Sequence, residues 1–132
     1  MAADDRSRSN SAARYPGRAS IDAYGNGGFR FAGMSHKGSI LCLTDAIVAW
    51  EPVTVADLTA ASFREVFAAK SDIDFVLLGT GDTHVPAPQK VSDAFRAAGV
   101  SLDVMSTGSA ARTYNILLAE GRRVVAALLQ AC

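Results

Sequence analysis

The sequence predicts a single compact α/β domain of three layers, with a central mixed, mainly parallel sheet and additional N-terminal antiparallel hairpins. Two observations indicate this fold class. The first half of the chain carries short extended segments separated by glycine-rich turns. The second half alternates apolar runs with helical patterns, which is typical of right-handed crossover units around parallel strands. We therefore expect four strands followed by three helix–strand units.

The N-terminal half is expected to form two strand pairs. The segment IDAYGNGGFRF, residues 21–31, contains two extended pieces around a turn whose glycines can adopt positive φ. A second pair follows, KGSILCLTD at 37–45 and AIVAWEP at 46–52. Proline cannot donate a ladder hydrogen bond, so Pro52 ends the second pair.

A helix is expected over residues 56–69, with Thr54 or Asp57 as its cap. Its large apolar side chains recur with helical spacing near one face: Leu58, Phe63, Val66 and Phe67. The run IDFVLLG, residues 73–79, is continuously apolar and ends at Gly79, which is typical of a strand covered on both faces.

Two more helices and two more strands complete the predicted order. A helix over residues 88–98 ends at Gly99, a residue suited to the left-handed C-terminal position. The strand VSLDVM, 100–105, leads into a helix over 109–120 that stops at Gly121. The strand RRVVAALL, 122–129, is the last element.

Residues 1–18 are expected to form a disordered tail, and residues 19–132 a single domain. The tail holds four arginines and three serines but almost no large apolar side chain, so burial cannot offset its ordering entropy. A mitochondrial transit peptide is also rich in Arg and Ser, but it is poor in acids and amphipathic. Asp4 and Asp5 favour a plain tail.

Composition excludes several classes of function. Thirteen basic residues balance thirteen acidic ones, so no net field draws the chain to nucleic acid. The apolar run at 124–129 is far shorter than the roughly 20 residues of a membrane-spanning helix, so we expect a soluble protein that is not integral to a membrane. Cys42 and Cys132 are expected to be reduced thiols in a reducing compartment.

The common cofactor and metal motifs are absent from the sequence. Gly79-Thr80-Gly81 follows a strand, but His84 stands where a dinucleotide-binding fingerprint needs its third glycine. No G-x-S-x-G elbow is present, and His36 and His84 lack partners at metal-ligand spacing. We therefore predict no cofactor, no metal and no catalytic residue.

The segment STGSAARTYNILLAEGRR, residues 106–123, is the strongest candidate site. Two strands are expected to end at Gly79 and Met105, so the loops after them should meet at the carboxyl edge of the sheet. Thr107 or Ser109 can cap the following helix, whose N-terminus favours an anion, and Arg112 can clamp a carboxylate or phosphate. The hypothetical anion site comprises Thr80, Gly81, Thr107, Gly108, Ser109 and Arg112.

A purely structural interpretation uses the same residues. Thr107 or Ser109 then satisfies free amides, Gly108 permits the turn, and Arg112 lies over the surface or pairs with an acid. Asn115 is expected to hydrogen-bond to neighbouring backbone. No carboxylate pair, activated nucleophile or general base is fixed beside the loop, which argues against catalysis.

Several segments together resemble the family catalogued as domain of unknown function 498. They are YGNGGFRF, KGSILCL, the isolated Trp50, FVLLGTG and VMSTGSAARTYNILLAEGRRVVAAL, and the resemblance covers residues 21–129. This family includes the mitochondrial assembly factor 3 of the respiratory complex I alpha subcomplex. The resemblance implies a three-layer α/β domain that binds other proteins during assembly of a membrane complex, without established enzymatic activity.

Two functional hypotheses follow. The first is a non-enzymatic protein-interaction domain, similar to a complex I assembly factor, with complex I subunits or other assembly factors as partners and an exposed apolar patch or groove. It is expected in the cytoplasm of a bacterium or, alternatively, in a mitochondrion. The second is a small anionic-ligand-binding module or enzyme that uses the loops at Thr80-Gly81 and Thr107–Arg112. Homo-oligomerisation is compatible with either hypothesis.

Overall fold

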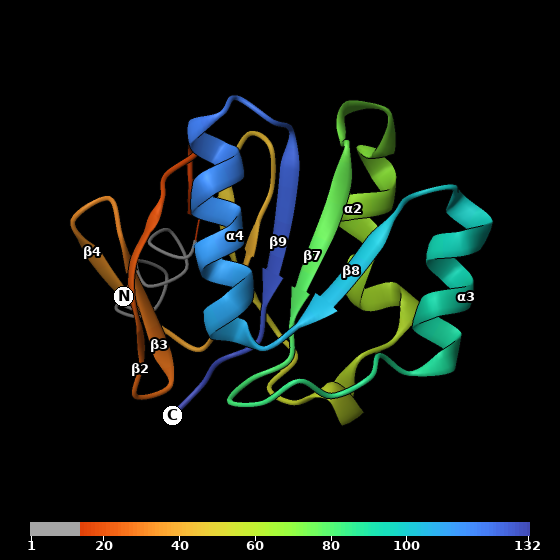
Figure 1. Ribbon diagram of the computed structural model, residues 1–132, viewed down its shortest axis with the longest axis horizontal. Coiled ribbons are helices and arrows are strands. Elements are labelled where there is room, and N and C mark those ends of the chain that lie inside the picture. The colour runs from red at the N-terminus through yellow and green to blue at the C-terminus, as the bar shows by residue number, and fades with distance from the viewer. Residues whose placement is uncertain (1–13) are drawn as a thin grey trace, which may run out of the picture.

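The computed structural model describes residues 14–132, which form three layers (Figure 1). A six-stranded sheet is the middle layer, with strand order β1-β6-β5-β9-β7-β8. Its strands are β1 (Arg14–Tyr15), β5 (Ser39–Cys42), β6 (Ile47–Trp50), β7 (Phe75–Gly79), β8 (Leu102–Met105) and β9 (Val124–Leu128). The helix α4 (Thr107–Ala119) and a separate three-stranded sheet cover one face, and α2 (Arg64–Ala68) and α3 (Gln89–Ala98) cover the other. The predicted α/β class is confirmed.

The middle sheet is mixed, as predicted, but its parallel part is limited to β9-β7-β8. The pairs β7/β8 and β7/β9 are parallel. The pairs β5/β9, β5/β6 and β1/β6 are antiparallel. The hairpin β5–β6 joins the edge of β9 and extends the sheet, so antiparallel pairings outnumber parallel ones.

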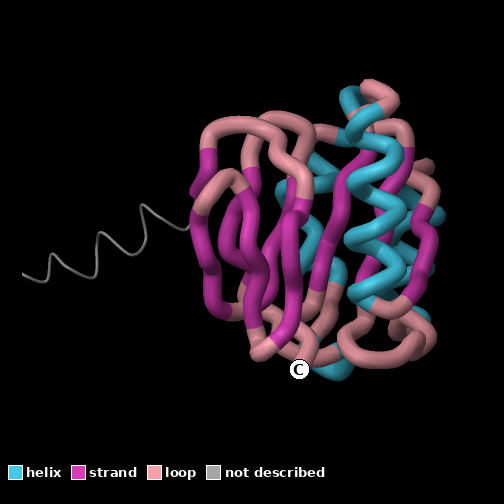
Figure 2. The backbone as a smooth tube through the Cα atoms, turned by 60° about the vertical axis from the view of Figure 1, so that its left-hand side comes forward, coloured by secondary structure: helices cyan, strands magenta, loops and turns pink. Residues whose placement is uncertain are grey.

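The smaller sheet contains β2 (Ile21–Gly25), β3 (Gly28–Phe31) and β4 (Met34–Lys37), all antiparallel. The predicted hairpin over residues 21–31 is confirmed, and Asn26 (φ 52°) and Gly27 (φ 75°) form its two-residue turn. The strand β4 was not expected. Figure 2 turns this sheet toward the viewer and shows it beside α4.

The helix expected over residues 56–69 is wrong as a continuous element. The chain instead forms two 3₁₀ turns, η1 (Val55–Asp57) and η2 (Ala60–Phe63), and then the short α2, with a further turn η3 (Lys70–Asp72). The Asp57 carboxylate accepts the amide of Thr54 at 3.0 Å, and the Ser62 hydroxyl accepts the amide of Thr59 at 3.0 Å. These two side chains interrupt the helix at two positions, because they give the backbone amides local hydrogen-bond acceptors in place of helical carbonyl groups.

The other two helices lie close to their predicted positions. Gly99, with φ 73°, ends α3 in the left-handed conformation. The helix α4 begins two residues earlier than expected, at Thr107, and is followed by Gly121 with φ 76°. The C-terminal ends of both helices are therefore marked in the sequence by a glycine that adopts positive φ.

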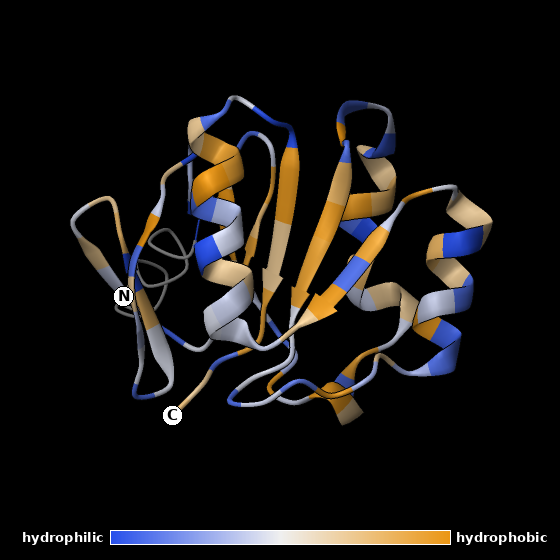
Figure 3. Ribbon diagram, in the orientation of Figure 1, coloured by the Kyte–Doolittle hydropathy of each residue, from blue (hydrophilic) through white to orange (hydrophobic). Residues whose placement is uncertain are grey.

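Alternation along the middle strands divides the apolar core between the two faces of the sheet. Leu41, Leu78 and Ala127 point to the face of α2 and α3, whereas their neighbours Ile40, Leu77 and Ala126 point to the face of α4 and the small sheet. Figure 3 shows this apolar character along β7 and β9. The central strands are therefore buried on both sides.

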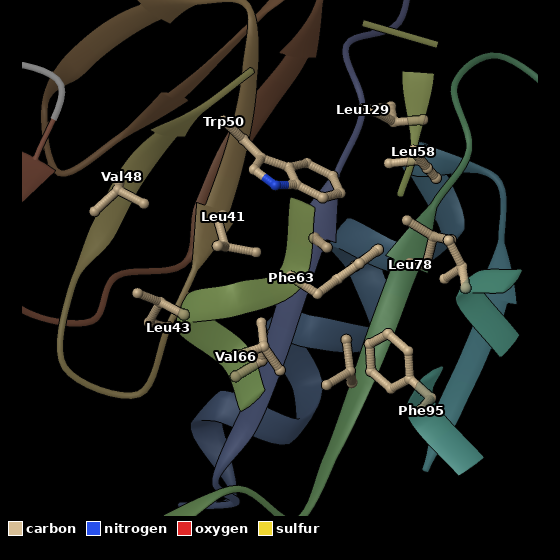
Figure 4. Packing of buried hydrophobic residues seen from close by; sticks show 14 of the residues in the cluster. Leu41, Leu43, Val48, Trp50, Leu58, Phe63, Val66, Leu78, Phe95 and Leu129 are labelled. Atoms are coloured by element: carbon tan, nitrogen blue, oxygen red, sulfur yellow. The ribbon is translucent and has the colours of Figure 1, made fainter. Parts of the chain in front are cut away.

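An aromatic cluster fills the core on the α2 and α3 side (Figure 4). Phe63 packs edge-on against Trp50 and Phe95, with ring centroids 5.3 and 4.9 Å apart. The indole Nε1 of Trp50 donates to the carbonyl of Ser62 at 2.8 Å. Trp50 thus ties β6 to η2, which explains how an irregular segment stays fixed against the sheet.

Residues 1–13, most of the expected tail, lie outside the described residues. The remaining part of that segment contacts the domain. Arg14 and Tyr15 pair with Val48 and Ile47 of β6. The Nη2 of Arg18 donates to the carbonyl of Arg122 at 2.7 Å. Arg14, Tyr15 and Arg18, which the sequence analysis assigned to the tail, therefore contact the domain.

Candidate functional site at the start of α4

The two loops of the predicted site meet. Gly79 and Met105 are register partners at the carboxyl ends of β7 and β8. The amide of Thr80 donates to the carbonyl of Met105 at 2.9 Å, and the amide of Thr107 donates to the carbonyl of Gly81 at 2.9 Å. Parallel strands that end together bring both loops to the N-terminus of α4, as Figure 1 shows at the base of these strands. We call residues 79–83 and 105–109, together with Leu129, the junction.

The hydroxyl of Thr107 locks the junction from inside. It accepts the amide of Gly81 at 2.8 Å and donates to the carbonyl of Leu129 at 2.7 Å. Thr107 is completely buried. Its hydroxyl therefore joins the β7 loop, α4 and the end of β9, and it is directed into the protein.

Thr80 fixes the shape of its own loop. Its hydroxyl donates to the carbonyl of Thr83 at 2.6 Å and accepts the amide of Val85 at 3.0 Å. Thr80 is also buried. These bonds turn the chain sharply after β7, and they use the hydroxyl that was expected to face a ligand.

The predicted caps of α4 were wrong, because Ser106 occupies the N-cap position. The Ser106 Oγ accepts the amide of Ser109 at 3.4 Å and donates to the Ser109 Oγ at 3.2 Å. Thr107 is the first helical residue instead. It packs so closely on β7 that a Cβ added at Gly79 would lie 2.8 Å from the Thr107 Cα. Gly79 is therefore required for this approach.

Tyr24, which the sequence did not place here, covers the first turn of α4. A Cβ added at Gly108 would collide with the phenol oxygen of Tyr24. The Tyr24 side chain remains 44% exposed, so it forms part of the surface beside the junction. The sequence analysis expected Gly108 only to permit the turn before the helix, and it did not predict this contact between residues far apart in the chain.

Arg112 is the predicted site residue that remains free. Its side chain is exposed, and its Nη2 lies 3.4 Å from the Ser109 Oγ. Among residues 14–132, no acidic side chain forms an ion pair with it. The structure therefore brings all six predicted residues together, but only Arg112 presents a charged group to solvent.

The buried titratable groups lie elsewhere and are held in their neutral forms. Burial raises the pKa of the Cys42 thiol to about 12, and burial also raises the pKa of Tyr114. Partial burial lowers the pKa of His36 on β4. No group of three or more His, Cys, Asp or Glu side chains within the described part of the chain could hold a metal ion. The junction thus offers hydrogen bonds and the exposed Asp82 carboxylate, and the Arg112 guanidinium lies beside it on α4.

A shallow hollow of about 290 Å³ adjoins the junction, between the β7 loop and the C-terminal residues. Thr80, Gly81, Asp82, Gln130 and Cys132 contribute to its lining. The Asp82 Oδ1 accepts the amide of Cys132 at 2.9 Å. This carboxylate raises the pKa of the Cys132 thiol through a hydrogen bond and through its charge. The acidic side chain makes this hollow a poor match for an anion.

Residues 21–129 match the family described as protein of unknown function (DUF498/DUF598). The chain belongs to this family. It is 42% identical to an uncharacterised protein of Rhodobacter capsulatus over 115 residues, which are 87% of each protein. A crystal structure described as an outer membrane protein from Bartonella henselae is 44% identical, with a TM-score of 0.83 over 89% of this chain and 99% of that one.

Relatives with a functional name also occur in this family. The chain is 33% identical over 109 residues to the human NADH dehydrogenase [ubiquinone] 1 alpha subcomplex assembly factor 3. The match covers 83% of this chain and 59% of the human protein, so the chain spans about three fifths of that relative's length. In residues 14–132, no helix is long and apolar enough to cross a membrane.

Proposed function

We propose that this chain is a non-enzymatic protein-interaction domain that takes part in the assembly of respiratory complex I, with complex I subunits or other assembly factors as its partners. The observation that supports this proposal is the relation to the human assembly factor, which extends over 83% of the chain. The likeness spans the whole family domain and not an isolated motif. The proposed location is the cytoplasm of a bacterium, with the mitochondrion as the alternative.

The chemistry of the junction agrees with binding better than with catalysis. The hydroxyls of Thr80 and Thr107 are engaged with backbone groups inside the protein. Catalysis needs an acid, base or nucleophile that is directed at a substrate. The exposed carboxylate of the junction, Asp82, instead accepts the amide of Cys132, and the hydroxyls of Ser106 and Ser109 bond to each other. Large apolar side chains that are exposed come from separate segments of the described chain: Tyr24, Val53, Val85 and Ile116. They are candidate contact residues for a partner.

The test is affinity purification of the tagged protein from its native cells, followed by cross-linking and mass spectrometry. We expect complex I subunits or assembly factors to be enriched over the same tag on an unrelated protein of similar size. A deletion strain should accumulate incomplete complex I on native gels while other respiratory complexes stay intact. Repeated absence of complex I proteins, together with normal complex I in the deletion strain, would refute the proposal.

A second candidate function is the binding of a small anion beside Arg112. It is favoured by the convergence of both loops at α4 and by the exposed Arg112 guanidinium, with which no acidic side chain among residues 14–132 forms an ion pair. Titration with inorganic phosphate should then shift the amide resonances of Gly81 and Gly108, and Arg112→Gln should remove the shifts. Lys90→Gln on α3 is the matched control. Shifts that persist in Arg112→Gln, or that never appear, would exclude this site.

A further inference from the structure

The outer face of the small sheet carries a hollow of about 290 Å³ that the sequence analysis did not single out. Strand register places directly opposed residues on one face, and these are Ala23, Arg30 and Ser35, and then Gly25, Gly28 and Lys37. Phe29 and Phe31, which alternate with them, point into the core. We call the hollow lined by these six residues the basic trough.

The charges around the trough have one sign. Arg30 and Lys37 are exposed, and within residues 14–132 the side chain of Arg30 bonds only to the Ser35 hydroxyl, 3.4 Å from its Nη1. No acidic residue lines the hollow, since Asp22 lies at the bulge of β2 outside it. Among residues 14–132, no carboxylate forms an ion pair with either cation. The trough therefore presents two uncompensated positive charges.

Close packing and hydrogen bonds hold the small sheet in place. Gly28 is buried, and a Cβ there would collide with the carbonyl oxygen of His36, so β3 and β4 lie close together at this point. The adjoining hairpin is fixed to the end of the chain, because the amide of Gly27 donates to the carbonyl of Ala131 at 2.8 Å. At the other end of β2, the Asn115 side chain binds both the amide and the carbonyl of Ile21, at 2.7 and 2.9 Å. A surface held in this way loses little conformational entropy when a partner binds.

We propose that the basic trough is the docking site for an acidic, extended segment of a partner protein. This inference rests on the proposed function, since it names the surface that the interaction uses. Carboxylate side chains complement the exposed Arg30 and Lys37.

The number of basic residues in the trough is too small for an anionic membrane or a nucleic acid to be the preferred partner. Surfaces that recognise anionic lipids carry clusters of roughly 4–8 basic residues. Nucleic-acid binders typically neutralise about 6–10 phosphates, and a trough with two cations provides far fewer contacts. A concave surface also suits the side chains of a single segment better than a flat bilayer. The net charge of zero adds no long-range attraction to either polyanion.

The binding test uses a fluorescent peptide of four Glu-Val repeats, with four Lys-Val repeats as the opposite-charge control. We expect the acidic peptide to bind more weakly as salt increases and to shift the amide resonances of Gly25, Gly28 and Arg30. Arg30→Glu combined with Lys37→Glu should weaken binding by about tenfold or more. Lys70→Glu combined with Lys90→Glu makes the same change of net charge on the opposite side of the sheet and should leave binding unchanged.

Four results would overturn the proposal: equal weakening by both double variants, equal binding of both peptides, no binding of the acidic peptide, or shifts confined to other elements. Vesicles of phosphatidylglycerol and phosphatidylcholine are titrated in parallel. Binding to vesicles without binding to the peptide would assign the trough to a membrane surface instead. A trough-dependent dimer in sedimentation, without peptide binding, would assign it to a second copy of the chain.

A second experiment separates this inference from the proposed function. A photo-cross-linking amino acid is placed in native cells at Ser35 in the trough or at Ser92 on α3. We expect Ser35 to cross-link to an acidic segment of a complex I subunit or assembly factor. If such a partner is captured from Ser92 and not from Ser35, the proposed function stands and the trough is excluded. If Ser35 captures an acidic segment of a protein unrelated to complex I, the trough stands and only the complex I assignment fails.

Discussion

Thr107 is the side chain on which the junction depends. In Thr107→Val the amide of Gly81 and the carbonyl of Leu129 lose their partner, and each buried unsatisfied group costs about 1–3 kcal/mol. We expect the free energy of unfolding to fall by about 2–4 kcal/mol in urea titrations followed by Trp50 fluorescence. Thr107→Ser keeps the hydroxyl and should lose only about 1 kcal/mol for the missing methyl group. Equal losses in the two variants would show that the hydroxyl is not responsible.

The two thiols should react very differently. Cys42 is fully buried with its pKa raised to about 12, so it should resist iodoacetamide in the native protein. Cys132 is exposed, but Asp82 raises its pKa and so lowers its thiolate fraction near neutral pH. Asp82→Asn should accelerate alkylation of Cys132 several-fold, as measured by mass spectrometry over time, whereas Asp72→Asn should not. An unchanged rate in Asp82→Asn would contradict this electrostatic link.

At the scale of single residues, the sequence predicted correctly that the two loops meet. It did not predict which of their side chains point into the protein. Parallel strands that end at Gly79 and Met105 require the loops to converge, so all six site residues lie together. The Thr107 hydroxyl points inward because it donates to the carbonyl of Leu129, which lies 22 residues further along the chain and cannot be placed by local sequence patterns. Tyr24 reaches Gly108 from another sheet, and no local pattern in either segment encodes that approach.

Asp74 links the two neighbouring parallel strands at their starting ends. Its Oδ2 accepts the amide of Arg123 at 3.1 Å and lies 3.5 Å from the Nε of Arg122. The Arg123 amide hydrogen bond, and then the charges of Arg123 and Arg122, lower the pKa of Asp74 from 3.8. A carboxylate with a lowered folded-state pKa stabilises the protein above its unfolded pKa, and this contribution is lost as the pH falls through the folded value.

Asp74→Asn should therefore reduce the free energy of unfolding near neutral pH but not in strong acid. The difference from the wild type is expected to shrink as the pH falls below about 4, where the Asp74 carboxyl of the unfolded chain becomes protonated, and to be lost once the pH is below the lowered folded-state pKa. Urea titrations between about pH 7 and about pH 2 measure this difference. Asp72→Asn, two residues away and without an ion pair to the described residues, is the control. A difference that stays constant with pH would show that charge is not involved.

At the level of whole elements, the sequence predicted correctly those helices and strands that are specified by their own residues. The apolar run of β7 and the glycine that ends α3 both mark elements that the structure contains at those positions. The segment over residues 55–68 has helical spacing of Leu58, Phe63 and Val66, and these side chains are indeed buried. Its backbone is nevertheless broken, because the side chains of Asp57 and Ser62 accept the backbone amides of Thr54 and Thr59. Trp50 then fixes the broken segment by donating to the carbonyl of Ser62. The strand β4 was missed because its stability comes from pairing with β3 and not from an alternating apolar pattern.

Across the whole molecule, the two apolar clusters share the same four strands. Adjacent residues of β5, β6, β7 and β9 face opposite layers, such as Leu77 toward α4 and Leu78 toward α2 and α3. Displacing either layer would expose one face of strands whose other face is still packed. Exposing one face of these strands to water would lose a large part of their apolar burial. We therefore expect the layer of α2 and α3 and the layer of α4 and the small sheet to unfold together.

Trp50 and Cys42 report on opposite sides of the sheet and can test this cooperativity. Trp50 belongs to the cluster beneath α2 and α3, and Cys42 to the cluster beneath α4 and the small sheet. In a Cys132→Ser variant, Cys42 is the only thiol left, so pulsed alkylation across a urea series measures exposure of its layer alone. The midpoint should coincide with that of Trp50 fluorescence, since both probes follow one transition. Alkylation of Cys42 at lower urea than the fluorescence change would mean that α4 and the small sheet detach first, so that the basic trough would belong to a separately unfolding unit.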